Sequence, residues 1–183
     1  GILEGAVAER PAELQVLVLR DVLTGLPNRR ALLETLPEAM GRARRVGRPC
    51  ALLFLDMDGF KAVNDNHGHE EGDELLRQFG ARLLQGVRKT DMVARLAGDE
   101  FVVVLEMLAD AVHAEDTARK LLARLKEPFV LRTATVTVGA SIGVALHRPA
   151  DEPDLDAWLA RADHAMYAVK RTGKNGVALA AAM

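Results

Sequence analysis

Apolar residues in this chain gather in runs with the length of strands and in stretches with the spacing of helices. Residues 50–56 are almost entirely apolar, which is typical of a central strand buried on both faces of a sheet. The apolar runs 91–96 and 101–106 flank Ala97-Gly98, a pattern that indicates a β-hairpin. Two further strands are expected later in the chain, the second in the β-branched stretch 133–145.

Four helices are expected: one over residues 29–46, a second that includes residues 75–87, a third at about 109–126 and a fourth at about 154–171. Apolar residues recur at helical spacing in the second and the last of these. They are Leu75, Leu76, Phe79, Leu83 and Val87, and then Leu155, Trp158, Leu159, Ala162, Met166 and Val169. The segment between the first strand and the second helix is rich in Gly, Asn and Asp and is expected to be a loop. Residues 178–182 are expected to be a frayed end.

The order β-α-β-β-α-β, with additional helices, predicts an α+β fold. A central, mainly antiparallel sheet would carry helices on its faces, around a palm-like or ferredoxin-like core. Residues 1–20 predict a short connector helix at the end of a linker, from the spacing of Leu14, Leu17 and Val18. Residues 21–183 would then form one domain.

The composition excludes some classes of function. With 183 residues and 49% hydrophobic side chains, the chain can bury the core of one ordinary domain. A net charge of −2 and an aromatic content of 4% provide neither the basic field nor the stacking platforms of nucleic-acid-binding proteins. We therefore expect no nucleic-acid partner.

Cellular location is suggested by the single cysteine and by the absence of long apolar runs. Cys50 lies in an apolar run and is predicted to be a buried thiol, which fits a reducing compartment. No run approaches the roughly 18 apolar residues of a membrane span, and nothing resembles a signal peptide. A cytoplasmic domain is expected. Because the chain begins with Gly1, we expect a fragment of a longer protein, which could itself be membrane-anchored.

The first candidate site segment is Asp56-Met57-Asp58, at the end of the first apolar run. Carboxylates at a strand end can ligate Mg²⁺ that also holds a phosphorylated substrate, and the following loop can present N–H groups to phosphates. Lys61 could neutralise charge on a reacting phosphoryl group. Asn64 and Asp73 offer donors and acceptors suited to a purine edge. The alternative is a surface turn, in which Asp73 caps its helix and His69 bonds local backbone.

The second candidate segment, residues 95–101, places Asp99 and Glu100 in the turn of the predicted hairpin. Gly98 would let a ligand approach the backbone closely, beside one metal ligand and one base. The alternative is a polar hairpin tip without a function. The chemistry requires that both acidic segments share one site.

Several segments occur in a characteristic order. They are Asp-Val-Leu-Thr-Gly-Leu-Pro-Asn-Arg-Arg at 21–30, Asp-Met-Asp-Gly-Phe-Lys-Ala-Val-Asn-Asp at 56–65, Gly-His at 68–69, Gly-Asp at 72–73, Arg-Leu-Ala-Gly-Asp-Glu-Phe at 95–101, Ala-Ser-Ile-Gly-Val-Ala at 140–145 and Ala-Met-Tyr-Ala-Val-Lys-Arg-Thr-Gly-Lys-Asn at 165–175. In this order and spacing the chain resembles the GGDEF family of diguanylate cyclase domains, from about Asp21 to Ala178.

The resemblance implies an enzyme that condenses two GTP into cyclic di-GMP and two pyrophosphates. By similarity, Asp56 and Asp99 would hold Mg²⁺ (or Mn²⁺) with the carbonyl of Met57. Asp99 would also accept the proton of the ribose 3′-hydroxyl, Glu100 would support the site, and Lys61 would stabilise the transition state. The implied substrate-binding residues are Phe60, Lys61, Asn64, His69, Asp73, Gly98, Lys170 and Lys174; Asn64 and Asp73 would read the guanine, and the last two lysines would grip the terminal phosphates.

The resemblance also implies an inhibitory site at Arg88 and Asp91, where the family binds the guanines of cyclic di-GMP. Arginine can be bidentate to the guanine O6/N7 edge, and aspartate can accept from N1–H. The alternative is a solvated ion pair in a loop.

Because each domain would bind one GTP, catalysis implies a homodimer. An upstream sensor and a downstream phosphodiesterase domain are further expectations, the latter from residues 125–129, which resemble a segment of tandem cyclase–phosphodiesterase proteins.

The chain departs from the family signature at Ala97, where the first glycine is expected. A positive φ at this alanine would cost about 1–2 kcal/mol, which corresponds to roughly a tenfold slower reaction; its Cβ could also crowd a nucleotide. We expect retained but reduced activity. The alternative is a degenerate domain that binds GTP or cyclic di-GMP and regulates a neighbour. A palm-like cyclase or polymerase with another substrate is a third possibility, which the guanine readers oppose.

Overall fold

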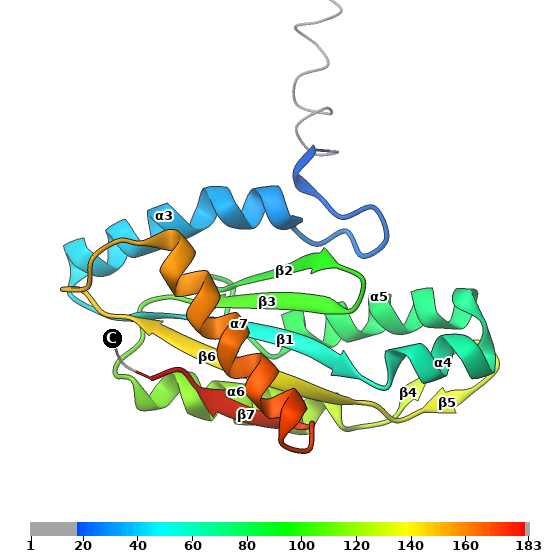
Figure 1. Ribbon diagram of the computed structural model, residues 1–183. Helices are drawn as coiled ribbons and strands as arrows, with labels where there is room; N and C mark the ends of the chain where they lie inside the picture. Colours follow the sequence, from blue (N-terminus) through cyan, green and yellow to red (C-terminus); the bar gives the residue numbers. More distant parts are fainter. Residues whose placement is uncertain (1–17, 182–183) are drawn as a thin grey trace, which may run out of the picture.

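The structure is a computed structural model that describes residues 18–181 (Figure 1). The predicted connector helix over residues 1–20 therefore lies almost entirely outside the described residues. In chain order, the elements are α3 (Arg29–Val46), β1 (Cys50–Asp58), α4 (Phe60–His67), α5 (His69–Gln85), β2 (Met92–Ala97), β3 (Glu100–Leu105), α6 (Val112–Leu125), β4 (Phe129–Val130), β5 (Thr135–Val136), β6 (Gly139–His147), α7 (Leu155–Arg171) and β7 (Gly176–Leu179).

The main sheet has five strands in the order β2-β3-β1-β6-β7. The central strand β1 is antiparallel to both neighbours, β3 and β6, and only the β6–β7 pair is parallel. Helices follow β1 and β3, so the chain has the predicted β-α-β-β-α-β core. The predicted α+β class and mainly antiparallel sheet are confirmed.

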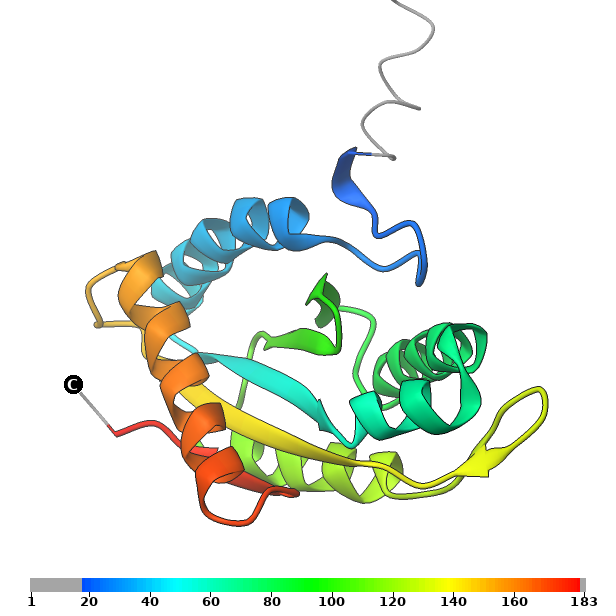
Figure 2. The ribbon, with the colours of Figure 1, turned by 45° about the vertical axis from the view of Figure 1, so that its right-hand side comes forward.

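Helices cover both faces of the sheet, as Figure 2 shows. Alternate residues of β1 explain this arrangement, because successive side chains of a strand point to opposite faces. Leu53 and Leu55 pack in a core with α5 and α6, whereas Leu52 and Phe54 pack in a second core with α3 and α7. An uninterrupted apolar run was therefore the right signal for a strand buried on both faces.

Three sequence expectations are corrected by the structure. The segment after β1 is the helix α4, not a loop, with Gly59 and Gly68 at positive φ at its two ends. The predicted strand 133–145 is divided between β5 and β6. The expected frayed end is also wrong up to Leu179, because β7 pairs with β6 and places Ala178 opposite Gly143.

The expectation of a buried Cys50 is confirmed. The Cys50 side chain is buried, and burial raises the pKa of its thiol to about 12. Asn28 caps α3, since its Oδ1 accepts a hydrogen bond from Ala31 N at 3.1 Å. Within residues 18–181, none of the helices combines the length and the hydrophobicity needed to span a bilayer.

Candidate active site

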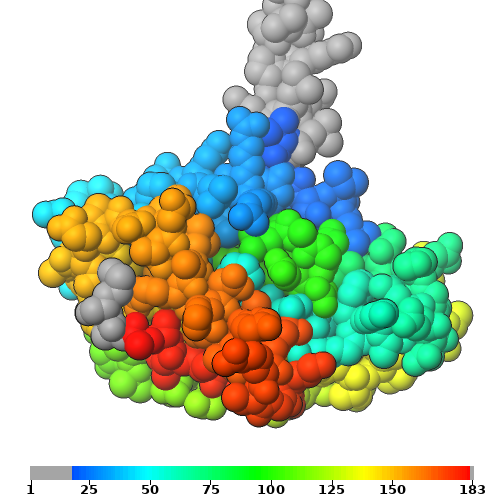
Figure 3. All heavy atoms as spheres, in the orientation of Figure 1, coloured from blue at the N-terminus to red at the C-terminus, as the bar shows by residue number. Residues whose placement is uncertain are grey.

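The two acidic segments meet at one edge of the sheet. In the antiparallel pairing of β1 with β3, Asp56 lies opposite Glu100, and Met57 N donates to Asp99 O at 3.2 Å. This register follows from the fold, because β3 begins where β1 ends. On the molecular surface, hairpin β2–β3 lies between α3 and α4, with the C-terminal part of α7 below it in Figure 3. The main requirement of the sequence hypothesis, that both segments share one site, is met.

This cluster concentrates negative charge in a partly buried place. Burial and the charge of the neighbouring Asp56 carboxylate raise the pKa of Asp99 to about 6. Burial, followed by Asp56 and Asp163, also raises the pKa of Glu100. Asp56 Oδ1 is buried and has no hydrogen-bond partner among the described residues. An uncompensated carboxylate of this kind favours binding of a cation.

The residues present fit a divalent cation of the Mg²⁺ type. Across residues 18–181, no group of three or more His, Cys, Asp or Glu side chains forms a ready-made metal cage. Mg²⁺ does not need one, since it keeps several waters and binds through one or two carboxylates together with substrate phosphates. Asp56 and Asp99 have hard carboxylate oxygens of the kind that such a cation prefers, and one Asp56 oxygen has no partner among the described residues.

Helix α7 brings a lysine to the same cluster. Lys170 Nζ lies 3.0 Å from Asp56 Oδ2 and 3.2 Å from Asp58 Oδ1. Burial alone would lower the pKa of Lys170, but hydrogen bonds and the charges of the two aspartates raise it. Lys174 is exposed on the turn that follows α7. The structure thus places both predicted phosphate-binding lysines at the acidic end of β1, or on the turn beside it.

The predicted guanine readers come from α4 and α5, which pack side by side. A Cβ on Gly72 would lie 1.7 Å from Asn64 Oδ1, so the glycine allows the Asn64 side chain to lie directly against α5. Asp73 is the next residue, and it is exposed. It does not cap its helix, because the N-cap position is Gly68. Asn64 therefore lies against the turn of α5 that also carries Asp73.

The other predicted substrate contacts lie at the starts of the same two helices. Phe60 and Lys61 begin α4, directly after the acidic end of β1, and Lys61 is exposed. His69 begins α5 and is also exposed. Gly98 has a φ of 52° in the turn of the β2–β3 hairpin, a conformation that glycine adopts without strain.

Ala97 is accommodated without backbone strain. Among residues 18–181, the non-glycine residues with positive φ are Met107, Lys174 and Asn175. Ala97 is the exposed last residue of β2, where the pairing shifts by one position between Arg95 and Ala97. The expected cost of a positive φ at Ala97 is therefore absent, and only the crowding argument applies.

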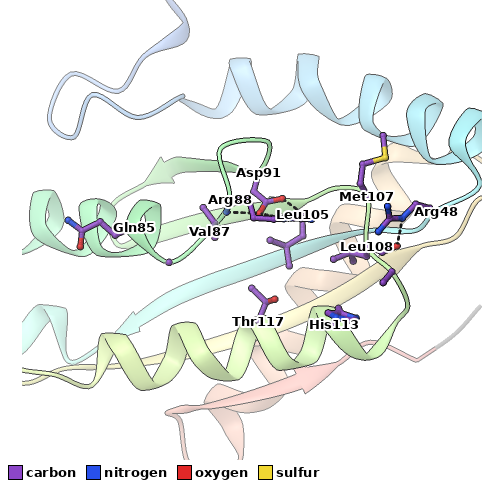
Figure 4. Close-up of a pocket in the computed structure, with 12 residues that line it drawn as sticks. Arg48, Gln85, Val87, Arg88, Asp91, Leu105, Met107, Leu108, His113 and Thr117 are labelled. Atoms are coloured by element: carbon purple, nitrogen blue, oxygen red, sulfur yellow. Dashed lines mark hydrogen bonds and ion pairs between the residues drawn. The ribbon is translucent and has the colours of Figure 1, made fainter.

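The predicted inhibitory pair is joined by several hydrogen bonds. Arg88 donates to Asp91 Oδ2 from N and Nε, at 2.9 and 3.1 Å, and to Oδ1 from Nη2 at 3.1 Å. Glu106 N also donates to Asp91 Oδ1, at 3.2 Å. The Asp91 side chain is 2% exposed and that of Arg88 is 52% exposed, so this is not a solvated ion pair. Figure 4 shows both residues on the wall of a cavity of about 530 Å³, opposite Arg48.

Sequence reasoning gave no role to several residues that hold the site together. The Glu71 carboxylate is buried and accepts from Arg132 N and from the backbone and hydroxyl of Thr133, which fixes the start of α5 to the β4–β5 hairpin. Arg95 Nη1 lies 3.0 Å from Asp21 Oδ1 and holds the β2–β3 hairpin to the turn before α3. A buried acidic residue on a helix leaves no periodic signal in the sequence.

Comparison with known proteins gives a consistent result. The family model described as "Diguanylate cyclase, GGDEF domain" matches residues 18–176. The bifunctional diguanylate cyclase/cyclic di-GMP phosphodiesterase MucR of Pseudomonas aeruginosa is 43% identical over 175 residues, which cover 96% of this chain and 25% of MucR. The response regulator PleD of Caulobacter vibrioides is 37% identical over 164 residues, covering 88% of this chain and 36% of PleD. The chain thus spans only a part of the curated relatives it matches.

Solved structures show the same similarity. The GGDEF domain of YfiN from Pseudomonas aeruginosa superposes with a TM-score of 0.82 at 37% identity, covering 87% of this chain and 99% of that one. The coiled coil and GGDEF domain of DgcB from Caulobacter crescentus, in complex with c-di-GMP, gives a TM-score of 0.79 at 28% identity, covering 98% of this chain and all (100%) of that one.

Proposed function

Because the chain belongs to the GGDEF family of diguanylate cyclase domains, we propose that it condenses two GTP into cyclic di-GMP and two pyrophosphates. The observation that carries the proposal is the shared acidic cluster of Asp56 and Asp99. One carboxylate oxygen of this cluster has no partner among the described residues, and the pKa of Asp99 is raised to about 6. Such a cluster suits a cation and a reacting phosphate.

In the proposed reaction, the 3′-hydroxyl oxygen of one GTP forms a bond to the α-phosphorus of the other. The bond from this phosphorus to the bridging oxygen breaks, and pyrophosphate leaves. Asp99 takes the hydroxyl proton. The same step at the second 3′-hydroxyl closes the ring. Since one domain binds one GTP, two domains must face each other, and we propose a homodimer as the active form.

The roles that we propose for the acidic and basic residues are those that the family resemblance implies. Asp56, Asp99 and the Met57 carbonyl would hold Mg²⁺ (or Mn²⁺), which polarises the α-phosphoryl group and lowers the pKa of the attacking hydroxyl. Glu100, beside Asp99, is a second carboxylate that adds negative charge to the site. Lys61 stabilises the charge that develops on the reacting phosphoryl group, and Lys170 and Lys174 bind the terminal phosphates.

GTP is selected through its base. Asn64 on α4 and Asp73 on the neighbouring α5 offer an amide and a carboxylate to the guanine edge, where a carboxylate accepts from N1–H and the exocyclic amine. His69 lies at the start of the same helix. Phe60 and Gly98 border the nucleotide from α4 and from the hairpin turn. ATP offers no N1–H donor, so it should compete poorly with GTP.

Product inhibition is proposed at Arg88 and Asp91. All four contacts of the Asp91 carboxylate are internal, so the buried aspartate mainly holds the arginine in place. The Arg88 guanidinium is half-exposed, and its Nε and Nη2 already donate to Asp91 and to Glu106 O. Among the described residues this leaves Nη1 as the donor available to the guanine O6/N7 edge. In this arrangement the arginine recognises cyclic di-GMP, and the aspartate orients it.

A second candidate function is a regulatory domain that binds GTP or cyclic di-GMP without turnover. Ala97 is the observation that favours it, because its Cβ stands in the signature turn. We propose in either case that the full-length protein carries an upstream sensor and a phosphodiesterase domain, in view of the bifunctional relative MucR, of which this chain covers 25%.

The two functions are separated by a turnover assay. The chain is fused to a dimeric coiled coil, incubated with GTP and Mg²⁺, and analysed for cyclic di-GMP by chromatography. Asp99→Ala should lose turnover while remaining folded, and unchanged product would refute the assignment. Tight cyclic di-GMP binding with no turnover in the forced dimer would establish the regulatory alternative. Competition between GTP and ATP tests the guanine selectivity.

A further inference from the structure

Asp58, the third residue of the first acidic segment, makes contacts that neither metal binding nor proton transfer requires. Its carboxylate accepts from Ser141 Oγ, at 3.0 Å to each oxygen, and from Lys170 Nζ at 3.2 Å. It also accepts from the backbone N–H of Asn175 at 2.7 Å. These donors come from β6, from α7 and from the turn between α7 and β7. The Asp58 side chain is 9% exposed, so this carboxylate is nearly buried among them.

The turn bound by Asp58 has an unusual backbone. Gly173, Lys174 and Asn175 all have positive φ, at 124°, 63° and 50°. Side chains other than glycine rarely adopt this conformation, and surrounding contacts must hold it in place. The N–H group of Asn175 bonds Asp58, and that of Lys174 bonds Val169 O at 2.9 Å. The shape of the turn that carries Lys174 therefore depends in part on Asp58.

Asp58 also determines where the ammonium group of Lys170 is held. Without Asp58, the ion pairs of Lys170 within residues 18–181 would be reduced to the one with Asp56, at 3.0 Å. Lys170 would then compete with a cation for that carboxylate. With Asp58 present, the lysine can stay beside the acidic cluster while Asp56 serves as a metal ligand.

We propose that Asp58 is a positioning residue for the triphosphate of the nucleotide. It orients Lys170 directly and Lys174 through the turn, so that both cations face the phosphates. This inference rests on the proposed function, because it assumes that the bound nucleotide is GTP. Asp58 acts through the lysines and has no part in reading the guanine.

The test compares affinity for a triphosphate with affinity for a monophosphate. Binding of 3′-deoxy-GTP, which cannot react, and of GMP is measured by calorimetry in the presence of Mg²⁺. Asp58→Asn should weaken 3′-deoxy-GTP binding about tenfold or more and leave GMP binding within about twofold. In the double variant Asp58→Asn with Lys170→Met, the loss of affinity should be smaller than the sum of the two single losses, because Lys170 carries part of the effect of Asp58 and the turn with Lys174 carries the rest.

Two further variants keep the test decisive. Ser141→Ala keeps the carboxylate but removes one donor, and it should give a smaller loss with the same preference for the triphosphate. Asp116→Asn makes the same chemical change at an exposed position of α6 and should have no effect. An equal loss for both nucleotides, or additive losses in the double variant, would overturn the inference. If the wild-type chain bound neither nucleotide, the proposed function itself would fall.

Discussion

Lys170 places its ammonium nitrogen 3.0 Å from Oδ2 of Asp56, so the last helix of the domain contacts the acidic end of its first strand. The contact neutralises the Asp56–Asp99 cluster only in part, because the other Asp56 oxygen has no partner within residues 18–181. The free domain thus holds a lysine next to carboxylates that are still able to accept a cation. The first two predictions follow from this charge balance.

Replacing Lys170 with Met should weaken both substrate use and folding stability. We expect kcat/KM for GTP to fall at least about tenfold, because a phosphate contact is lost. Unfolding free energy should fall by about 1–2 kcal/mol, because Asp56 and Asp58 lose their shared partner in a partly buried place. Cyclic di-GMP formation and urea unfolding measure the two effects.

The matched control for this prediction is Lys120→Met, at an exposed position of α6. It should change neither quantity. Mg²⁺ should return part of the stability lost in Lys170→Met, since a divalent cation can neutralise the same carboxylates. A variant with wild-type kcat/KM would show that Lys170 makes no important contact with the substrate.

Asp99→Asn should abolish turnover and yet stabilise the metal-free domain. The charge of Asp56 and burial both disfavour the ionised form of Asp99, whose pKa is about 6 against an ordinary value of 3.8. Discounted for the partial exposure of the group, the gain at pH 7.5 should be about 1 kcal/mol. Added Mg²⁺ should raise the melting temperature of the wild type more than that of the variant. A variant that is less stable than the wild type would contradict a repulsion between Asp56 and Asp99.

The sequence predicted those elements that carry a periodic apolar pattern. Strand β1, the β2–β3 hairpin and helices α5 and α7 all appear close to their expected positions, because each buries a regular set of side chains. The meeting of Asp56 with the hairpin was a hypothesis from the motif order, and it depended on the antiparallel pairing of two strands distant in sequence.

Other features had no local signal. Helix α4 buries only Val63 and lies between two glycines, so its composition is that of a loop. Strand β7 is an edge strand of alanine, valine and leucine whose pairing is set by β6. The role of Asp58 depends on donors more than 80 positions away in the sequence, which no spacing rule reveals.

His147 should make the fold less stable in mild acid. Its ring is 4% exposed and lies 5.5 Å from the Trp158 ring, and burial lowers its pKa below the ordinary 6.5; Asp151 opposes this shift and Arg161 adds to it. A depressed folded-state pKa means that the unfolded chain takes up the proton first. The contribution of neutral His147 to the unfolding free energy is therefore complete above about pH 6.5 and is lost as the pH falls.

The measurement for His147 is the slope of unfolding free energy against pH between 7.5 and 5. His147→Phe should flatten this slope relative to the wild type, whatever its effect at pH 7.5. His164→Phe, at an exposed position of α7, should leave the slope unchanged. Equal slopes in the wild type and His147→Phe would exclude His147 as the titrating group.

Replacing Arg88 and replacing Asp91 should have different effects on product inhibition and on stability. Arg88→Ala removes the half-exposed guanidinium and should raise the cyclic di-GMP concentration needed for inhibition at least about tenfold. The unfolding free energy should fall as well, because the buried Asp91 carboxylate loses its charged partner. Asp91→Ala removes a buried acceptor and leaves the Glu106 N–H without its partner, which should cost about 2–3 kcal/mol. Inhibition assays and urea unfolding measure these effects. Lys89→Ala, an exposed cation between them, should be neutral, and inhibition that survives Arg88→Ala would place the inhibitory site elsewhere.

Ala97→Gly tests how the alanine in the signature affects the domain. The alanine could strain the backbone, or its Cβ could crowd the nucleotide. Since Ala97 does not have a positive φ, glycine relieves no strain and should lower the unfolding free energy by about 0.5–1 kcal/mol. If the Cβ does not touch the nucleotide, turnover should change less than about threefold.

A gain of tenfold or more in turnover after Ala97→Gly would instead show that the Cβ crowds GTP, because no backbone strain is available to explain it. The two measurements must be made together, on the forced dimer and with urea unfolding of the same preparations. Ala111→Gly, just before α6 and far from the acidic cluster, controls for the general cost of an added glycine. Increased stability in Ala97→Gly would contradict the relaxed backbone described for this turn.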